Sequence, residues 1–167
     1  MKLEWVEKYM TDAEHLITDN QLEQGLGILT NLLYEEPGYG SLHNHLGWAY
    51  LYYAGDTAKA ELHFSMAMRF DAEYAAPYLH MGTLCIRGHR YDDAIKYAEQ
   101  GLTKASANKV ALYEIIGNAY ELKAEYTKAI KAYKAASMGS LATYEISNLT
   151  EGIKRCWKKR VTLFFTF

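Results

Sequence analysis

Leu46-Gly47-Trp48-Ala49-Tyr50 is a five-residue stretch that recurs twice, as Met81-Gly82-Thr83-Leu84-Cys85 and as Ile116-Gly117-Asn118-Ala119-Tyr120. In each copy an apolar residue precedes the glycine, and a large or apolar residue stands three positions after it. The glycines are 35 residues apart in both steps. A fixed period between about 20 and 50 residues is typical of proteins built from stacked repeats. The sequence therefore predicts a repeat architecture.

A second recurring motif follows each glycine and indicates the structure of the repeating unit. Alanines recur at Ala60, Ala94 and Ala129, and around them small and bulky residues fall on one face of a helix. Short turns precede these alanines, around Gly55, Gly88 and Ala124. Because a short turn makes two consecutive helices antiparallel neighbours, each unit is predicted to be a helical hairpin.

These residues resemble the tetratricopeptide repeat, a 34-residue helical hairpin with Leu-Gly, Tyr, Ala and aromatic residues at fixed positions. The second copy needs one extra residue between Leu51 and Gly55, where we expect a lengthened turn, and the first copy is degenerate. The best matches lie in the third and fourth copies, at Tyr78, Met81, Gly82, Tyr91, Ala94 and Gly101, and at Tyr113, Ile116, Gly117, Tyr120, Tyr126, Ala129, Tyr133 and Ala136.

The resemblance implies an all-α fold, a right-handed superhelix of antiparallel helix hairpins. We expect a single domain over residues 1–167, with repeats at about 6–39, 40–74, 75–109 and 110–143. A capping helix and tail would occupy about 140–167. The chain has 167 residues, 50% hydrophobic, and only 2 Pro, which suits a globular unit made of long helices.

Several classes of function find no support in the sequence. There is no secretory leader pattern at residues 1–8, no apolar run near the ~20 residues of a membrane helix, and no phosphate-binding glycine loop or nucleophile elbow. His43 and His45 would project about 200° apart on a helix, so they cannot chelate one metal ion. Cys85 takes a position that is buried in the repeat. We therefore expect no enzyme, no cofactor and no metal, and a cytoplasmic location.

In the resembled family the first helix of each hairpin lines a concave groove that binds a peptide or a helix of a partner protein. The residues that bind a carboxylate terminus in one subclass are absent here, because the matching positions hold Met10, Glu14, His45, Ala76 and His80. Carboxylates in the groove would favour a neutral or basic segment. The groove residues that the resemblance implies are Met10, Glu14, Ile17, Asn44, Trp48, Leu79, Thr83, Arg87, Glu114, Asn118 and Glu121.

Charge and apolarity at the two ends suggest an alternative function, a self-associating scaffold. Residues 1–40 carry a formal charge of −6 and residues 101–167 carry +6, within a total of −2. After five cations in residues 154–160, the chain ends in a nearly apolar run. That tail could fold back onto the capping helix or groove, mediate a homo-oligomer, or touch an anionic membrane or nucleic acid, the least favoured of the three. The candidate self-association residues are Trp157, Leu163, Phe164 and Phe165.

Overall fold

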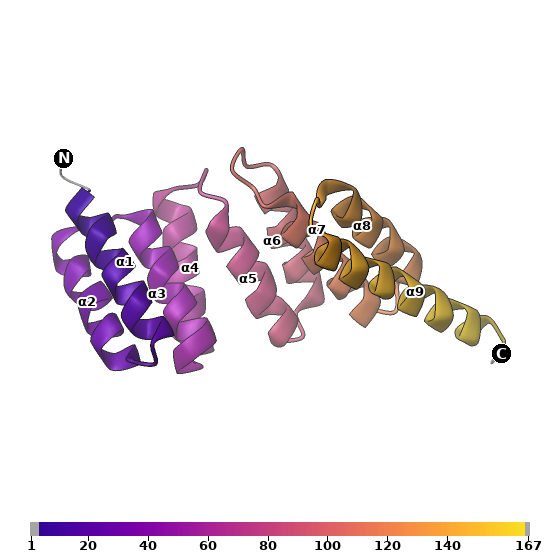
Figure 1. The fold of residues 1–167 in the computed structure, drawn as a ribbon, viewed down its shortest axis with the longest axis horizontal. Helices are drawn as coiled ribbons and strands as arrows, with labels where there is room; N and C mark the ends of the chain where they lie inside the picture. Colours follow the sequence, from indigo (N-terminus) through magenta and orange to yellow (C-terminus); the bar gives the residue numbers. More distant parts are fainter. Residues whose placement is uncertain (1–3, 166–167) are drawn as a thin grey trace. The chain divides into compact units, whose positions relative to one another are not determined.

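The structure, a computed structural model, describes residues 4–165, and side chains as far as Thr162. Every regular element in this range is helical (Figure 1). The chain divides into two compact units, Met1–His80 and Met81–Phe167, and each is described by itself. The α5 helix (Ala76–Arg87) begins in the first unit and ends in the second.

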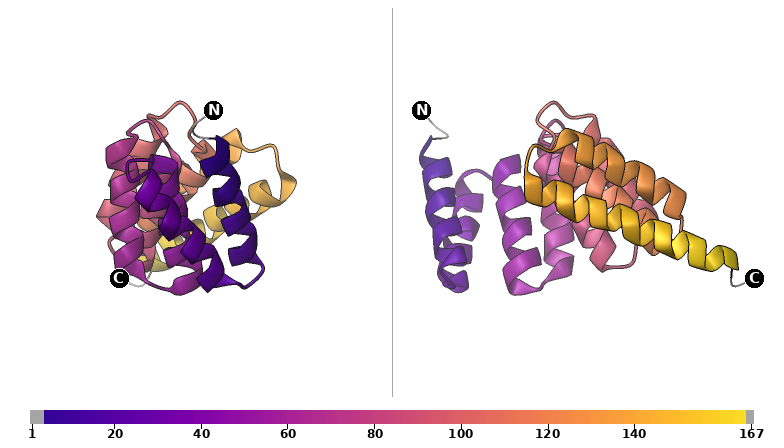
Figure 2. Two further views of the ribbon diagram at one scale, coloured as in Figure 1. Left: turned by 90° about the vertical axis from the view of Figure 1, so that its left-hand side faces the viewer. Right: turned by 45° about the vertical axis from the view of Figure 1, so that its right-hand side comes forward.

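Two antiparallel hairpins form most of the first unit. α1 (Glu4–Thr18) packs on α2 (Leu22–Glu35), and α3 (Gly40–Ala49) packs on α4 (Thr57–Phe70), as the ribbon shows (Figure 2). The apolar residues of α1 recur every three or four positions, so they form one stripe that faces the neighbouring helices. The core of this unit is made of Val6, Met10, Ala13, Ile17, Leu29, Leu32, Leu42, Leu46 and Ala49.

The extra residue of the second hairpin lies in a π-helix, η1 (Tyr50–Ala54), which continues α3 directly. We expected a lengthened turn between Leu51 and Gly55, and this expectation was wrong. A π-helix places one more residue in each turn than an α-helix does, so it absorbs an insertion without leaving the helical path. The segment ends at Gly55, whose φ of 70° lies in the left-handed region that glycine adopts without strain.

The second unit contains the rest of α5, α6 (Tyr91–Leu102), α7 (Lys109–Leu122), α8 (Tyr126–Gly139) and α9 (Thr143–Phe165). α8 packs between α7 and α9, and the α8–α9 pair lies side by side in Figure 2. Cys156 of α9 and Ala129, Tyr133 and Ala136 of α8 form the centre of the core. α9 is thus the helix that covers the last hairpin, as expected of a cap.

The predicted apolar tail is a continuation of α9 and not a separate segment, because its backbone is helical as far as Phe165. The side chains of Leu163, Phe164 and Phe165 lie outside the described residues. Trp157 is 47% exposed and Val161 48% exposed on the last turns of this helix.

The repeated glycines are explained by close helix packing in the second and fourth hairpins. A Cβ atom on Gly47 would lie 2.5 Å from the Phe64 ring, and one on Gly117 would lie 2.6 Å from the Tyr133 ring. Both distances are too short for two carbon atoms, so only glycine lets the first helix rest on the aromatic ring of the second. In the third hairpin Ala98 stands where a ring would be, and a Cβ atom on Gly82 would lie 3.2 Å from Ile115 of the next helix pair.

Candidate protein-binding surface

Two of the eleven predicted groove residues belong to the hydrophobic core. Met10 is 3% exposed and Ile17 is 0% exposed, in the apolar stripe of α1. Placing them on an open groove was therefore wrong. In the degenerate first hairpin the stripe that packs on α2 and α3 includes both side chains, so neither is available to a partner.

Asn44 and Glu121 are also buried, although both are polar. Asn44 is 6% exposed on α3, and Glu121 is 7% exposed on α7, where side chains of α9 cover it. The family resemblance had placed both residues on the groove. A capping helix that carries cations supplies the missing partner for Glu121, and that signal was present in the sequence at Arg155 and Lys159.

The remaining predicted residues are at least partly accessible on the first helices of the hairpins. Glu14, Arg87 and Glu114 are exposed, and Trp48, Leu79, Thr83 and Asn118 are partly buried. Partial desolvation by neighbouring atoms, together with the nearby Glu145 carboxylate, raises the pKa of Glu114 although its side chain is largely exposed.

Aromatic side chains gather where α3 runs into η1. The rings of Trp48 and Tyr53 have their centroids 4.8 Å apart, and Tyr52 lies edge-on to the ring of His80. Tyr52 and Tyr53 are 38% and 43% exposed. We name Trp48, Tyr52 and Tyr53 the aromatic cluster. Tyr53 was missed because its direction depends on the π-helix, which no residue pattern indicated.

A cluster of polar side chains lies beside the N-terminal end of α3. We name it the Glu7 patch, and its members are Glu7, Tyr39, Ser41, Asn44 and Tyr74. The Tyr39 hydroxyl donates to Glu7 Oε1 at 2.5 Å, and Asn44 Nδ2 donates to the Tyr74 hydroxyl at 3.3 Å. Ser41 lies near both phenols and has a lowering influence on the pKa of each. Burial, together with the bond to Glu7, raises the pKa of Tyr39 to about 12.

Glu121 is the centre of a network that ties three helices of the second unit together. Its carboxylate accepts from Arg155 Nε at 2.6 Å and Nη2 at 2.7 Å, from Lys159 Nζ at 2.7 Å and from the Tyr133 hydroxyl at 2.9 Å. Tyr133 also donates to Asn118 Oδ1 at 2.7 Å. Burial alone would raise the pKa of Glu121, but the hydrogen bonds from Arg155, Lys159 and Tyr133 outweigh it and lower that pKa to about 2.

Two histidines pair inside the second hairpin. His43 Nε2 donates to the Pro37 carbonyl oxygen at 2.9 Å, which leaves His43 Nδ1 to accept from His63 Nδ1 at 3.0 Å. His43 is 4% exposed. Burial, and then the neighbouring His43 and Lys59, lower the pKa of His63 to about 4. Both imidazoles are thus engaged in contacts within this hairpin.

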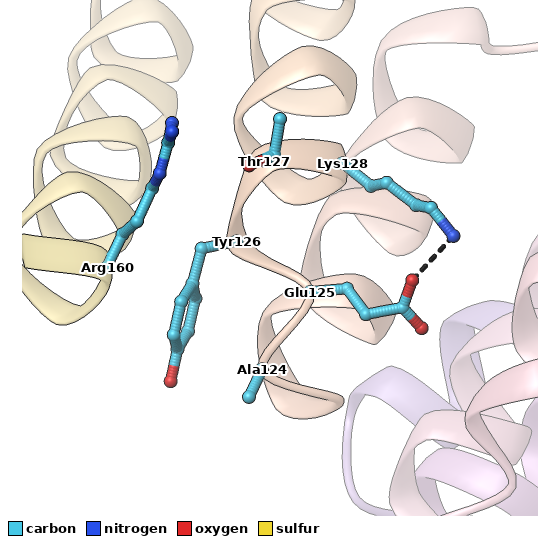
Figure 3. A pocket seen from close by; sticks show the side chains of 6 residues that line it. All are labelled: Ala124, Glu125, Tyr126, Thr127, Lys128 and Arg160. Atoms are coloured by element: carbon cyan, nitrogen blue, oxygen red, sulfur yellow. Dashed lines mark ion pairs between the residues drawn. The ribbon is translucent and has the colours of Figure 1, made fainter. Parts of the chain in front are cut away.

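A shallow hollow of about 300 Å³ lies at the start of α8, lined by Ala124, Glu125, Tyr126, Thr127, Lys128 and Arg160 (Figure 3). Arg160 reaches it from α9, and Lys128 pairs with Glu125 at 2.6 Å.

Among the described residues, no three His, Cys, Asp or Glu side chains are arranged to hold a metal ion. Within the same residues no helix has both the length and the apolarity needed to span a bilayer.

No protein-family model and no curated protein matches this sequence. Solved structures do resemble its fold. PilW, a type IV pilus biogenesis factor, superposes with a TM-score of 0.78 at 14% identity, covering 93% of this chain and 76% of PilW. A structure of MamA from Desulfovibrio magneticus, from residue 41 to its end, superposes with a TM-score of 0.68 at 16% identity. The match covers 95% of this chain and 97% of that structure.

The tetratricopeptide-repeat domain of Arabidopsis OM64 gives a TM-score of 0.63 at 18% identity, covering 71% of this chain and 94% of the domain. Identities this low show the fold alone. Together with the helical hairpins and the glycine spacing, they establish that this chain has an all-α, tetratricopeptide-repeat-like solenoid fold.

Proposed function

We propose that this chain is a non-enzymatic binding module, and that the exposed faces of its first helices hold a peptide segment or helix of a partner protein. The observation that carries the proposal is the aromatic cluster of Trp48, Tyr52 and Tyr53. Large aromatic side chains supply contact area at a small cost in side-chain entropy and are enriched among the residues that dominate binding energy.

The composition of the first helices supports the same function. Glu14 Oε2 lies 3.8 Å from His45 Nε2 in the first unit, and in the second unit Thr83, Arg87 and Glu114 remain accessible. Mixed polar and aromatic surfaces of this kind are typical of protein interfaces. We also propose a cytoplasmic location, which the two buried cysteine thiols favour.

Replacing Trp48 by alanine is expected to weaken peptide binding by about ten-fold or more, because the indole is the largest anchor of the face. Random dodecapeptides selected on the immobilised chain would be measured individually by fluorescence anisotropy. Tyr34→Ala is the matched control, since Tyr34 is 83% exposed on α2, a second helix. Peptides that bind Trp48→Ala as tightly as the unmodified chain would contradict the proposal.

Self-association is a second candidate function, favoured by a hollow on the first hairpin and by charge. Trp5, Tyr9, Ile28, Asn31, Leu32 and Glu35 line a hollow of about 370 Å³. The first unit holds 4 Lys and Arg against 12 Asp and Glu, a net charge of −8, and the second holds 14 against 8, a net charge of +6. A second copy could therefore place the basic, aromatic end of its α9 against this hollow.

Under this second candidate the chain is expected to form dimers or larger species in 50 mM salt and to dissociate in 500 mM salt, because screening weakens attraction between exposed charges. Light scattering after size exclusion measures the mass across protein concentration. Lys158→Glu with Arg160→Glu on α9 should give monomers, whereas Lys131→Glu with Lys134→Glu, exposed on α8, should not. A monomer at every concentration in low salt would exclude the candidate.

A further inference from the structure

We propose that the Glu7 patch is a subsite for a positively charged side chain, Lys or Arg, of the bound segment. The inference deepens the proposed function and rests on it. It assigns a charge preference to one place on the first unit, at the boundary between α1 and α3.

The buried amide of Asn44 is the observation that points to a ligand. Its Oδ1 atom is inaccessible to solvent and has no hydrogen-bond partner among the described residues. A buried carbonyl oxygen without a donor costs free energy that a leucine of similar shape would not cost. Fold stability therefore does not explain an asparagine here, whereas a donor group supplied by a ligand does.

The groups around Asn44 define which donor fits. Glu7 is an exposed carboxyl group that accepts from Tyr39, and the phenols of Tyr39 and Tyr74 both lie near Ser41. All three are acceptors, and an ammonium or guanidinium group offers several donors with a positive charge. Tyr74 is only partly buried, so a turn of its phenol away from Asn44 Nδ2 would open a path to the amide.

The net charge of the first unit is negative, which favours binding of a cation. Its net charge is −8, and no Lys or Arg belongs to the patch. Lys8, Lys59 and Arg69 are the cations among residues 4–80. An anionic ligand would instead meet Glu7 and the unpaired amide oxygen, both of which repel it.

The test uses the full chain and three fluorescein-labelled probes, each a tripeptide repeated four times: Arg-Gly-Ser, citrulline-Gly-Ser and Glu-Gly-Ser. Citrulline keeps the shape of arginine and removes its charge. Anisotropy titrations in 150 mM salt should show the arginine probe binding about ten-fold more tightly than the citrulline probe, and no binding of the glutamate probe.

Matched variants separate the patch from general electrostatic attraction. Glu7→Gln should weaken binding of the arginine probe about ten-fold. Glu23→Gln, the same charge change at an exposed residue of α2, should change the affinity for that probe less than two-fold. Equal losses for the two variants would overturn the inference, because they would indicate attraction to the unit as a whole.

Asn44→Leu provides a readout that a structural role would not give. Binding should fall about ten-fold while the midpoint of denaturant unfolding stays the same or rises. Tyr39→Phe, which removes only the hydroxyl, is a second variant that preserves the fold. A lowered midpoint with unchanged binding would overturn the inference. Display-selected peptides that need Trp48 but lack Lys and Arg would overturn it too, and would leave the proposed function standing.

Discussion

Glu121→Gln is expected to lower the free energy of unfolding by about 2–3 kcal/mol at pH 7. The folded-state pKa of Glu121 is about 2 against an ordinary 4.5, and a tenfold change in an ionisation constant corresponds to about 1.4 kcal/mol. The resulting difference of about 3.5 kcal/mol is reduced because Arg155 and Lys159 are half exposed and partly screened. Loss of the carboxylate also removes an acceptor of the buried Tyr133 hydroxyl.

Glu114→Gln is the matched control for this prediction, on the same helix and with the same change of charge. Because partial desolvation and Glu145 raise the pKa of Glu114, its neutralisation should leave the free energy of unfolding unchanged or slightly higher. Denaturant titration measures both variants, and hydrogen exchange of the α9 amides shows whether this helix opens first in Glu121→Gln. Equal destabilisation by the two variants would contradict the role of the network.

The same network predicts behaviour in acid. A carboxyl group whose pKa is lowered by folding stabilises the folded state fully above its unfolded pKa, and this contribution is lost as the pH falls through the folded value. For Glu121 the loss therefore occurs between about pH 4.5 and pH 2.

A second loss of stability is expected at milder pH, between about 6.5 and 4, from histidines of the first unit. Burial, and then His45, lower the pKa of His80 to about 4, where it stacks on Phe64. His63, beside His43 and Lys59, has a similar pKa. For a histidine with a lowered folded pKa, the unfolded chain binds more protons in this window, so stability falls as the pH falls.

The expected size is about 3 kcal/mol between pH 7.5 and pH 5, roughly 2 from His80 and 1 from the more accessible His63. Denaturant titrations at several pH values measure it, and His63→Gln with His80→Gln should flatten the curve over this range. Salt at 0.5 M should leave the slope nearly unchanged, because burial is the main cause and is not screened. A double variant that keeps the slope would show that other groups are responsible.

The helical hairpins and their order could be predicted because the glycine spacing reports a packing constraint. Gly47 and Gly117 each lie against an aromatic ring, and both partners are visible in the sequence as a small and a large residue. The π-helix at Tyr50–Ala54 could not be predicted, since an inserted residue can enter a turn or a helix and the sequence alone does not distinguish them.

The binding surface was less predictable than the fold because it depends on which helix covers which. Met10 and Ile17 satisfy the position rule of the resembled family, yet their helix turns them into the core. Glu121 satisfies it too, and α9 covers it. The Glu7 patch draws on residues from α1, α3 and the loop before α5, so it exists only once these segments are folded together.

The glycine and ring pairs also bear on how freely hairpins could be recombined into new proteins. Gly47 with Phe64 and Gly117 with Tyr133 place equivalent ring atoms at the same crossing, so in a chimera either second helix should fit against either first helix there. A graft that puts Phe64 in place of Tyr133 would still lose the hydroxyl that donates to Glu121 and Asn118. The third hairpin has Ala98 at this crossing. A graft of its second helix onto either of these first helices would leave a void the size of a phenyl ring, so the third hairpin is not interchangeable with the second and fourth.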